Sequence, residues 1–135
     1  ETHLEVNQLA NQQHLDLLKQ GVYIWNQWRQ EHPHIRPDLS GSDLAWTHLS
    51  NADLSGVDLS GVDFTWADLY RANLVGANLS QANLSGADLS GTHLYHANLR
   101  RADLNGTLLY RADLREADLS ETNLHKAVLE ETVQK

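Results

Sequence analysis

Leucine recurs at every fifth position over most of the chain. These positions run from Leu39 to Leu129 and define 19 repeats over residues 37–131, with Phe64 as the one replacement for leucine. A small residue stands two places before each leucine, and it is alanine in 11 repeats. The place just before leucine is nearly always Asp or Asn, and seven of the eight glycines follow two places after it. Each repeat thus offers one apolar, one polar and one turn position.

A period of five fits neither a helix nor a strand. An α-helix would spread these leucines around all its faces, because it has 3.6 residues per turn. A strand would point successive leucines to opposite faces of a sheet. A chain that turns a corner once per repeat directs every leucine toward one axis, and glycine supplies φ freedom at the corners. We therefore expect an all-β solenoid in which the leucines, Phe64 and the small residues serve the fold rather than the function.

The motif A-(D/N)-L-x-x occurs in clean copies at 52–56, 82–86 and 87–91. It resembles the pentapeptide repeat proteins over about 70% of the chain, 95 of 135 residues. The resemblance implies a right-handed quadrilateral β-helix with four repeats per coil, so that residues 20 apart are vertical neighbours. The 19 repeats would then make just under five coils. At about 4.8 Å per coil, the rod would be roughly 23 Å long.

Residues 1–36 lack the five-residue period and are predicted to form an N-terminal helical cap and linker. Leu15, Leu18, Val22 and Trp25 are spaced as one face of an amphipathic helix. A solenoid exposes unpaired backbone groups at its ends and generally needs caps. We expect Leu18, Val22 and Trp25 to contact the first coil, and the alternative is a helix that docks a partner.

The predicted helix begins after Asn11 as N-cap and continues through Gly21. It ends before Pro33, because His32 is biased away from helical backbone. Apolar residues further upstream would extend it or form a short earlier helix: Leu4, Val6 and Leu9. Residues 25–33 resemble the lead-ins to pentapeptide arrays in cyanobacterial proteins.

Outward aromatic residues are the first candidates for binding a partner. Trp46 and Trp66 are 20 apart and should stack on one corner. Two adjacent exposed indoles suggest a contact, either with the N-terminal helix folded down the side or with a partner protein, unless they have no role. On another corner Tyr70 and Tyr110 flank a serine, with Arg71 and Arg111 beside them, and form either a recognition strip or solvated surface.

The C-terminal end is a candidate for self-association. Leu108 and Val128 take the place of the usual Asp or Asn and fall on one column, next to Tyr110. The tail at 132–135 is too short for a helical cap. An uncapped end beside an apolar patch predicts a homodimer through Leu108 and Val128.

Acidic residues dominate the first coils. Residues 37–96 contain seven Asp and one Arg, a balance of −6, whereas residues 97–135 contain seven acids and six bases, a balance of −1. Three coils span about 14 Å, over which B-DNA would carry about −8 at one charge per roughly 1.7 Å. Some pentapeptide repeat proteins protect DNA gyrase by resembling DNA. The resemblance therefore allows a DNA mimic, although a solvated repeat position is the simpler interpretation. The acids concerned are Asp38, Asp43, Asp53, Asp58, Asp63 and Asp68.

Composition excludes several kinds of chemistry. Without cysteine there is no disulfide, thiolate metal site or cysteine catalysis. The carboxylates should point outward with no pocket to raise a pKa, so we predict no catalytic residue and no cofactor. His93 and His96, like His32 and His34, lack a third ligand, so we expect no metal site. Asp113 is the expected column neighbour of His93 and its expected hydrogen-bond partner.

The net charge of −8 disfavours direct binding of nucleic acid. No apolar run approaches the roughly 20 residues that span a bilayer, and no signal peptide is evident. We therefore expect no membrane span and a soluble protein, whose compartment is unknown with the cytoplasm slightly favoured. The chain contains no Met, which predicts a trimmed or processed product.

These observations predict a non-catalytic rigid scaffold, or protein–protein interaction module, with an unidentified protein partner. The alternative is a DNA mimic that binds or regulates a nucleic-acid enzyme such as DNA gyrase. An accessory domain of an enzyme is a third possibility, which flanking sequence would decide.

Overall fold

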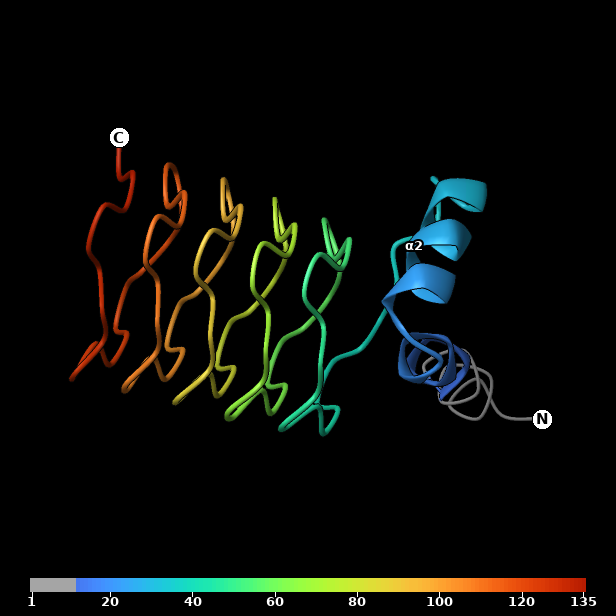
Figure 1. The fold of residues 1–135 in the computed structure, drawn as a ribbon, viewed down its shortest axis with the longest axis horizontal. Coiled ribbons are helices and arrows are strands. Elements are labelled where there is room, and N and C mark those ends of the chain that lie inside the picture. Colours follow the sequence, from blue (N-terminus) through green and yellow to red (C-terminus); the bar gives the residue numbers. More distant parts are fainter. Residues whose placement is uncertain (1–11) are drawn as a thin grey trace.

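The chain winds into a four-sided solenoid with helices at its N-terminal end. The computed structural model describes residues 12–135, and the predictions on Leu4, Val6, Leu9 and Asn11 lie outside that range. Figure 1 shows the coils stacked along the long axis, with α2 (Val22–Glu31) beside the first coil and the C-terminus at the opposite end.

Residues 20 apart are vertical neighbours throughout the solenoid. Sixteen parallel β-bridges join the coils, from Asp38–Asp58 to Asp113–Val133, and all have this offset. Each bridge is a single residue pair flanked by turns, and no longer strand occurs within residues 12–135. With a repeat of five, an offset of 20 gives four sides per coil. The predicted register is confirmed.

Each corner is a β-turn whose third residue has left-handed backbone. At one corner the amide of Ala52 donates to the carbonyl of Leu49 at 3.0 Å, and Asn51 has a φ of 65°. A positive φ at this place is the mark of a type II turn and favours glycine. Twelve residues other than glycine adopt it here, with φ between 56° and 65°, including Trp46 and Trp66. Stacking of the coils therefore imposes the corner even where the residue is not glycine.

The Asp or Asn of each repeat holds the turn that follows it. Oδ1 of Asp58 accepts the amide of Ser60 at 3.0 Å and its hydroxyl at 2.7 Å. Oδ1 of Asn78 accepts the amide of Ser80 at 3.1 Å. A hydrogen bond from the amide two residues later to Oδ1 occurs in all 15 repeats with Asp or Asn at this place. These are Asx-turns, so the position requires an acceptor oxygen rather than a charge.

The interior is a column of leucines. The repeat centres from Leu39 to Leu114, with Phe64 among them, are at most 3% exposed. Two of the buried small positions hold threonine, Thr92 and Thr107, whose hydroxyls each donate to a backbone carbonyl at 2.7 Å. These bonds offset the cost of burying a hydroxyl.

The N-terminal helical region is broken at Gly21. Residues 12–19 are helical, and α2 then runs from Val22 to Glu31. The expected continuous helix is therefore wrong, because Gly21 has a φ of 111° and a ψ of 161°, far from helical backbone. Glycine adopts this φ without a steric penalty. The end of α2 before His32 and Pro33 agrees with the prediction.

Both helical segments pack against the first coil. Leu18, from residues 12–19, and Trp25, from α2, are buried in the same apolar cluster as the leucine column. Val22 is half-buried against that cluster. The apolar interior thus continues from the coils into the helices.

Polar side chains of the helices bind backbone groups at the edge of the first coil. The amide of Asp53 donates to Oδ1 of Asn26 at 2.8 Å, and its carbonyl accepts from Nε1 of Trp25 at 2.7 Å. In the next coil the equivalent amide, that of Asn73, donates to the carbonyl of Ala52 at 2.9 Å. On another side the amide of Asp38 donates to Nδ1 of His14 at 3.0 Å. Side chains therefore replace a preceding coil at these places.

Candidate functional site

Trp46 and Trp66 form an exposed stacked pair on one corner. Their ring centroids are 5.7 Å apart with an interplanar angle of 18°. The two residues are 69% and 59% exposed. The hypothesis that the N-terminal helix covers them is wrong, because the helices lie at the end of the solenoid and bind the Asp38 and Asp53 edges instead.

The register places the aromatic residues around one side of the solenoid. Trp66 and Tyr70 occupy successive corners of one coil, on either side of Asp68. The tryptophan corner and the tyrosine corner therefore border the same side, which we call the Trp–Tyr face. Its outward column, from the N-terminal to the C-terminal end, is His48, Asp68, Asp88, Leu108 and Val128.

The tyrosine corner combines each ring with an arginine. The guanidinium of Arg71 lies 5.5 Å from the centroid of Tyr70, and that of Arg111 lies 5.3 Å from the centroid of Tyr110. Such cation–π contacts hold both side chains against the surface. A hollow of about 110 Å³ separates the two pairs, and we call its six lining residues the Tyr–Arg corner: Tyr70, Arg71, Ser90, Gly91, Tyr110 and Arg111.

Leu108 and Val128 are vertical neighbours at the C-terminal end of the Trp–Tyr face. Leu108 is 41% exposed. Because neither residue has a side-chain oxygen, their repeats lack the Asx-turn that stabilises most others. Leu108 is thus an exposed apolar side chain at a position where most repeats have a turn acceptor.

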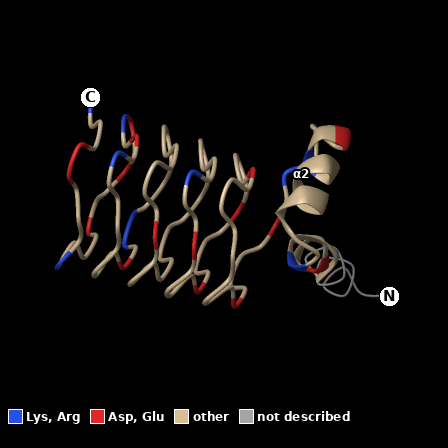
Figure 2. Ribbon diagram, in the orientation of Figure 1, with Lys and Arg blue, Asp and Glu red and all other residues tan. Residues whose placement is uncertain are grey.

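The acidic residues of the first coils are engaged in turns. Each of the six candidate acids of a DNA mimic accepts the amide two residues later through Oδ1. Figure 2 shows acidic residues along the whole solenoid and most of its basic residues toward the C-terminal end. There Arg100 and Arg101 contact Glu121 at 3.0 Å and 2.8 Å. The hydrogen bond from Arg101 lowers the pKa of Glu121.

The expected pairing of His93 with Asp113 is replaced by another contact. The two residues are vertical neighbours, but Nε and Nη2 of Arg115 donate to the Asp113 carboxylate at 2.9 Å and 2.7 Å. This hydrogen bonding from Arg115 lowers the pKa of Asp113. The carboxylate is therefore occupied by the arginine of its own repeat.

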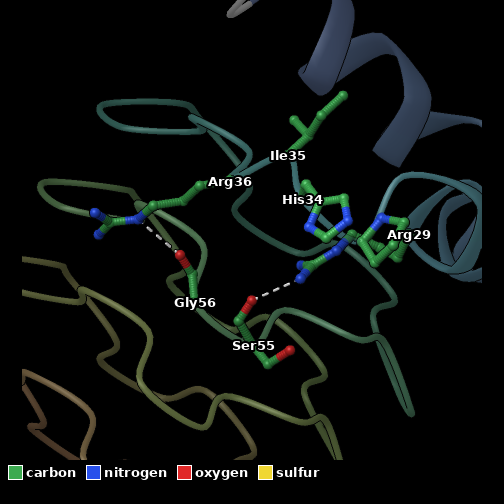
Figure 3. A pocket seen from close by; sticks show the side chains of 7 residues that line it. Arg29, His34, Ile35, Arg36, Ser55 and Gly56 are labelled. Atoms are coloured by element: carbon green, nitrogen blue, oxygen red, sulfur yellow. Dashed lines mark hydrogen bonds between the residues drawn. The ribbon is translucent and has the colours of Figure 1, made fainter.

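A shallow hollow of about 350 Å³ lies where the linker after α2 meets the first coil. In Figure 3, Nη2 of Arg29 donates to the carbonyl of Ser55 and Nε of Arg36 to that of Gly56, at 2.8 Å each. Burial lowers the pKa of Arg29. Both arginines are thus used to bind the edge of the first coil, so the hollow is part of the end contact.

The sequence pattern predicted the apolar contacts of this end but not the polar ones. Arg29 follows Trp25 at a spacing of four, which puts these two side chains on one face of the helix, and Asn26 beside them binds the amide of Asp53. The spacing of four between Trp25 and Arg29 was the sequence feature from which a polar contact beside Trp25 could have been predicted.

Within residues 12–135, no group of three or more His, Cys, Asp or Glu side chains could hold a metal ion. In the same part of the chain, every helix is too short or too polar to cross a membrane.

The four-sided parallel ladder, one turn per five residues and a leucine column define the class of quadrilateral β-helix solenoids. The family model for pentapeptide repeats (8 copies) matches residues 38–74, 72–109 and 97–133. The chain belongs to the pentapeptide repeat family, whose fold is a right-handed β-helix. No curated protein matches the chain.

Solved structures of cyanobacterial pentapeptide repeat proteins resemble the chain. HetL from Nostoc sp. strain PCC 7120, a protein involved in regulation of heterocyst differentiation, is 28% identical over 74% of this chain and 62% of its own, with a TM-score of 0.39. A second protein from Nostoc PCC 7120 is 37% identical over 73% and 69%, with a TM-score of 0.36. Rfr23 from Cyanothece 51142 is 26% identical over 82% and 93%, also with a TM-score of 0.36. The chain thus spans less than two thirds of HetL, and family membership rests on the repeat match.

Proposed function

We propose that this chain is a non-catalytic, rigid scaffold that binds a protein partner through the Trp–Tyr face. The exposed stack of Trp46 on Trp66 is the observation that carries this proposal. Tryptophan and tyrosine are enriched at binding surfaces, because they bury a large area and lose few rotamers on contact. Two indoles already stacked lose still less freedom when a partner covers them.

The backbone supports this role by holding the face rigid. The Trp66 corner is fixed in two ways, since Phe64, two residues before Trp66, is buried and the amide of Trp66 donates to the carbonyl of Ser85 at 3.1 Å. A surface that is ordered before binding loses less conformational entropy in the complex. No catalytic family is indicated for the chain, and binding is the activity that such a surface provides.

The helices act as an N-terminal cap in this proposal. Asp53 illustrates the reason, since without Trp25, Asn26 and Arg29 both its amide and its carbonyl would lie unpaired at an open edge. Open edges of this kind template association with another chain. The cap therefore favours binding through the side of the solenoid over stacking at its N-terminal end.

At the other end we propose a homodimer contact through Leu108 and Val128. Val133, in the last bridge, is 47% exposed beside this end. Exposed apolar side chains that lie side by side make self-association favourable.

A DNA mimic that binds a nucleic-acid enzyme such as gyrase is the second candidate. The balance of −6 over residues 37–96 favours it. The Asx-turns supply another reason for the same acids, because Asp and Asn are interchangeable acceptors there. The turns therefore account for the acids without mimicry, which makes the scaffold the better-supported function.

Two experiments separate these functions. In quantitative affinity capture from the native host, a true partner of the Trp–Tyr face is lost from W46S/W66S but retained by Tyr95→Ser, which removes an aromatic of 38% exposure from another corner. Equal capture by both variants contradicts the proposal.

In a gyrase supercoiling assay, replacing the six candidate acids by Asn removes charge while keeping every turn acceptor. An effect that requires the six Asp residues would establish mimicry instead.

A further inference from the structure

The hollow of the Tyr–Arg corner is built from two matching halves. Tyr70 with Arg71 and Tyr110 with Arg111 lie 40 residues apart, which is two coils at the observed offset of 20. The coil between them presents only Ser90 and Gly91. A single coil with small side chains between two Tyr–Arg pairs therefore leaves a notch in an otherwise continuous corner.

Arg71 reaches across this notch. A Cβ added to Gly91 would lie 3.1 Å from Cγ of Arg71, so the arginine stem lies over Gly91. Its guanidinium remains near the ring of Tyr70. The glycine thus gives Arg71 access to the hollow from one side, while Tyr110 and Arg111 border the other.

The charge in the hollow is not fully compensated. Arg71 is the one Lys or Arg residue between positions 37 and 96, and no ion pair in the described part of the chain includes it. Arg111 pairs with Glu131 at 3.4 Å, the longest of the ion pairs in residues 12–135. The nearby Asp68 and Asp88 direct Oδ1 to the amides of Tyr70 and Ser90. The Arg71 guanidinium at this opening is therefore left without an ion-pair partner within residues 12–135, in a chain of net charge −8.

We infer that this hollow binds the side-chain carboxylate of an acidic residue in a partner protein. The inference rests on the proposed scaffold function and names the chemistry that its partner presents. A guanidinium group binds a carboxylate through paired N–H donors, and the two tyrosines border the contact. Leu108 lies on the adjacent column, next to Tyr110, so an apolar residue beside the acid would complete the contact.

The size of the hollow selects the occupant. Its volume is about 110 Å³, smaller than the cavity of about 150 Å³ that is known to hold benzene. An Asp or Glu side chain therefore fits within it, whereas an entire aromatic ring would extend beyond it. The overall negative charge also disfavours a free polyanion, because long-range repulsion would oppose its approach.

The probe for this site is N-acetyl-glutamate N-methylamide, with the glutamine counterpart as a neutral analogue of the same shape. In titrations followed by NMR, the glutamate probe should shift the amide signals of Ser90, Gly91 and Tyr110. These shifts should saturate with a dissociation constant in the millimolar range. The glutamine probe should bind at least tenfold more weakly. Inorganic phosphate is the third arm, and binding as tight as that of glutamate would overturn the assignment to a carboxylate.

Three variants test the geometry. Arg71→Gln should weaken glutamate binding at least tenfold, and Ser90→Tyr should abolish it by filling the notch with the ring that the neighbouring coils carry. Arg101→Gln is the matched control, because this arginine occupies the same turn position on another corner and pairs with Glu121. Binding that is absent, or that survives Arg71→Gln and Ser90→Tyr in folded protein, overturns the inference. That failure would leave the tryptophan test of the scaffold function unaffected.

Discussion

The indole of Trp66 lies directly over Gly86 of the next coil. A Cβ added to Gly86 would come within 2.6 Å of the indole ring. Trp46 stacks on the other face of the same indole, so the stacked pair packs against the backbone of Gly86. The exposed aromatic stack therefore depends on a residue without a side chain one coil away.

Gly86→Ala should displace Trp66 and disrupt the stack, whereas Gly76→Ala should not. Both glycines have left-handed backbone, with φ of 71° and 66°, but nothing lies within 4 Å of a Cβ added to Gly76. Each change should therefore cost about 1–2 kcal/mol of stability for the backbone alone. Only Gly86→Ala should also lose the coupled tryptophan signal in near-ultraviolet circular dichroism. Loss of that signal in both variants would show that the stack does not depend specifically on the absence of a side chain at Gly86.

Replacing Asp58 by Asn should leave stability nearly unchanged, whereas Asp58→Ala should destabilise the fold. Asp58 accepts both the amide and the hydroxyl of Ser60, and Asn keeps the acceptor oxygen while Ala removes it. Loss of such a hydrogen bond costs about 0.5–1.5 kcal/mol. Urea unfolding of the three proteins measures the difference. If Asn proved as damaging as Ala, charge rather than the acceptor would be what the position requires.

Removal of the polar contacts of α2 should expose the first coil. In W25F/R29M the carbonyl of Asp53 loses its donors from Trp25 and Arg29. The open edge should then promote association, because unpaired strand edges bind other chains. Sedimentation velocity should show a concentration-dependent rise in mass for this variant. Arg101→Met, an exposed arginine away from the helices, is the control and should leave the mass unchanged.

Acidification should loosen the helical end through His14. Burial lowers the pKa of His14 from its ordinary 6.5, against the opposing charge of Asp38. Nδ1 of His14 must also be unprotonated to accept the amide of Asp38. The unfolded chain therefore binds the proton more readily than the folded one. The resulting stability is present above the unfolded pKa of about 6.5 and falls as the pH drops toward the lower folded pKa.

His14→Asn retains an acceptor but does not titrate at these pH values. Below pH 6.5, the ordinary pKa of histidine, the free energy of unfolding of this variant should therefore depend less on pH than that of the parent. The chain has eight histidines, and the difference between the two profiles isolates this one. Parallel profiles would show that His14 does not couple protonation to folding.

The double variant L108D/V128D should be a folded monomer. Each substitution removes an apolar side chain from the C-terminal end and supplies the acceptor oxygen that these two repeats lack. Light scattering of the parent and the variant measures the mass, and circular dichroism confirms the fold. A parent that is already monomeric, or a variant of unchanged dimeric mass, contradicts the proposed dimer contact.

Local sequence was ambiguous at two kinds of position. Gly21 lies within a helical pattern, and only contacts of both Leu18 and Trp25 with the first coil show why the chain breaks there. Asp58 and Asn78 were visibly equivalent in the repeat, but the amides that they hold are defined by the turn conformation. The break at Gly21 thus depends on contacts with a distant part of the chain, and the turn hydrogen bonds depend on backbone angles.

The five-residue period by itself determined the leucine interior and the corners, because burying every leucine on one axis requires a turn in each repeat. The offset of 20 required the resemblance to a known family, and the backbone ladder from Asp38 to Val133 establishes it. Only the tertiary structure decided that Trp66 lies over Gly86, that Trp25 and Arg29 bind the open edge, and that Arg71 reaches over Gly91. These relationships join residues that are neighbours across coils, and a linear pattern carries no information on how one coil rests on the next.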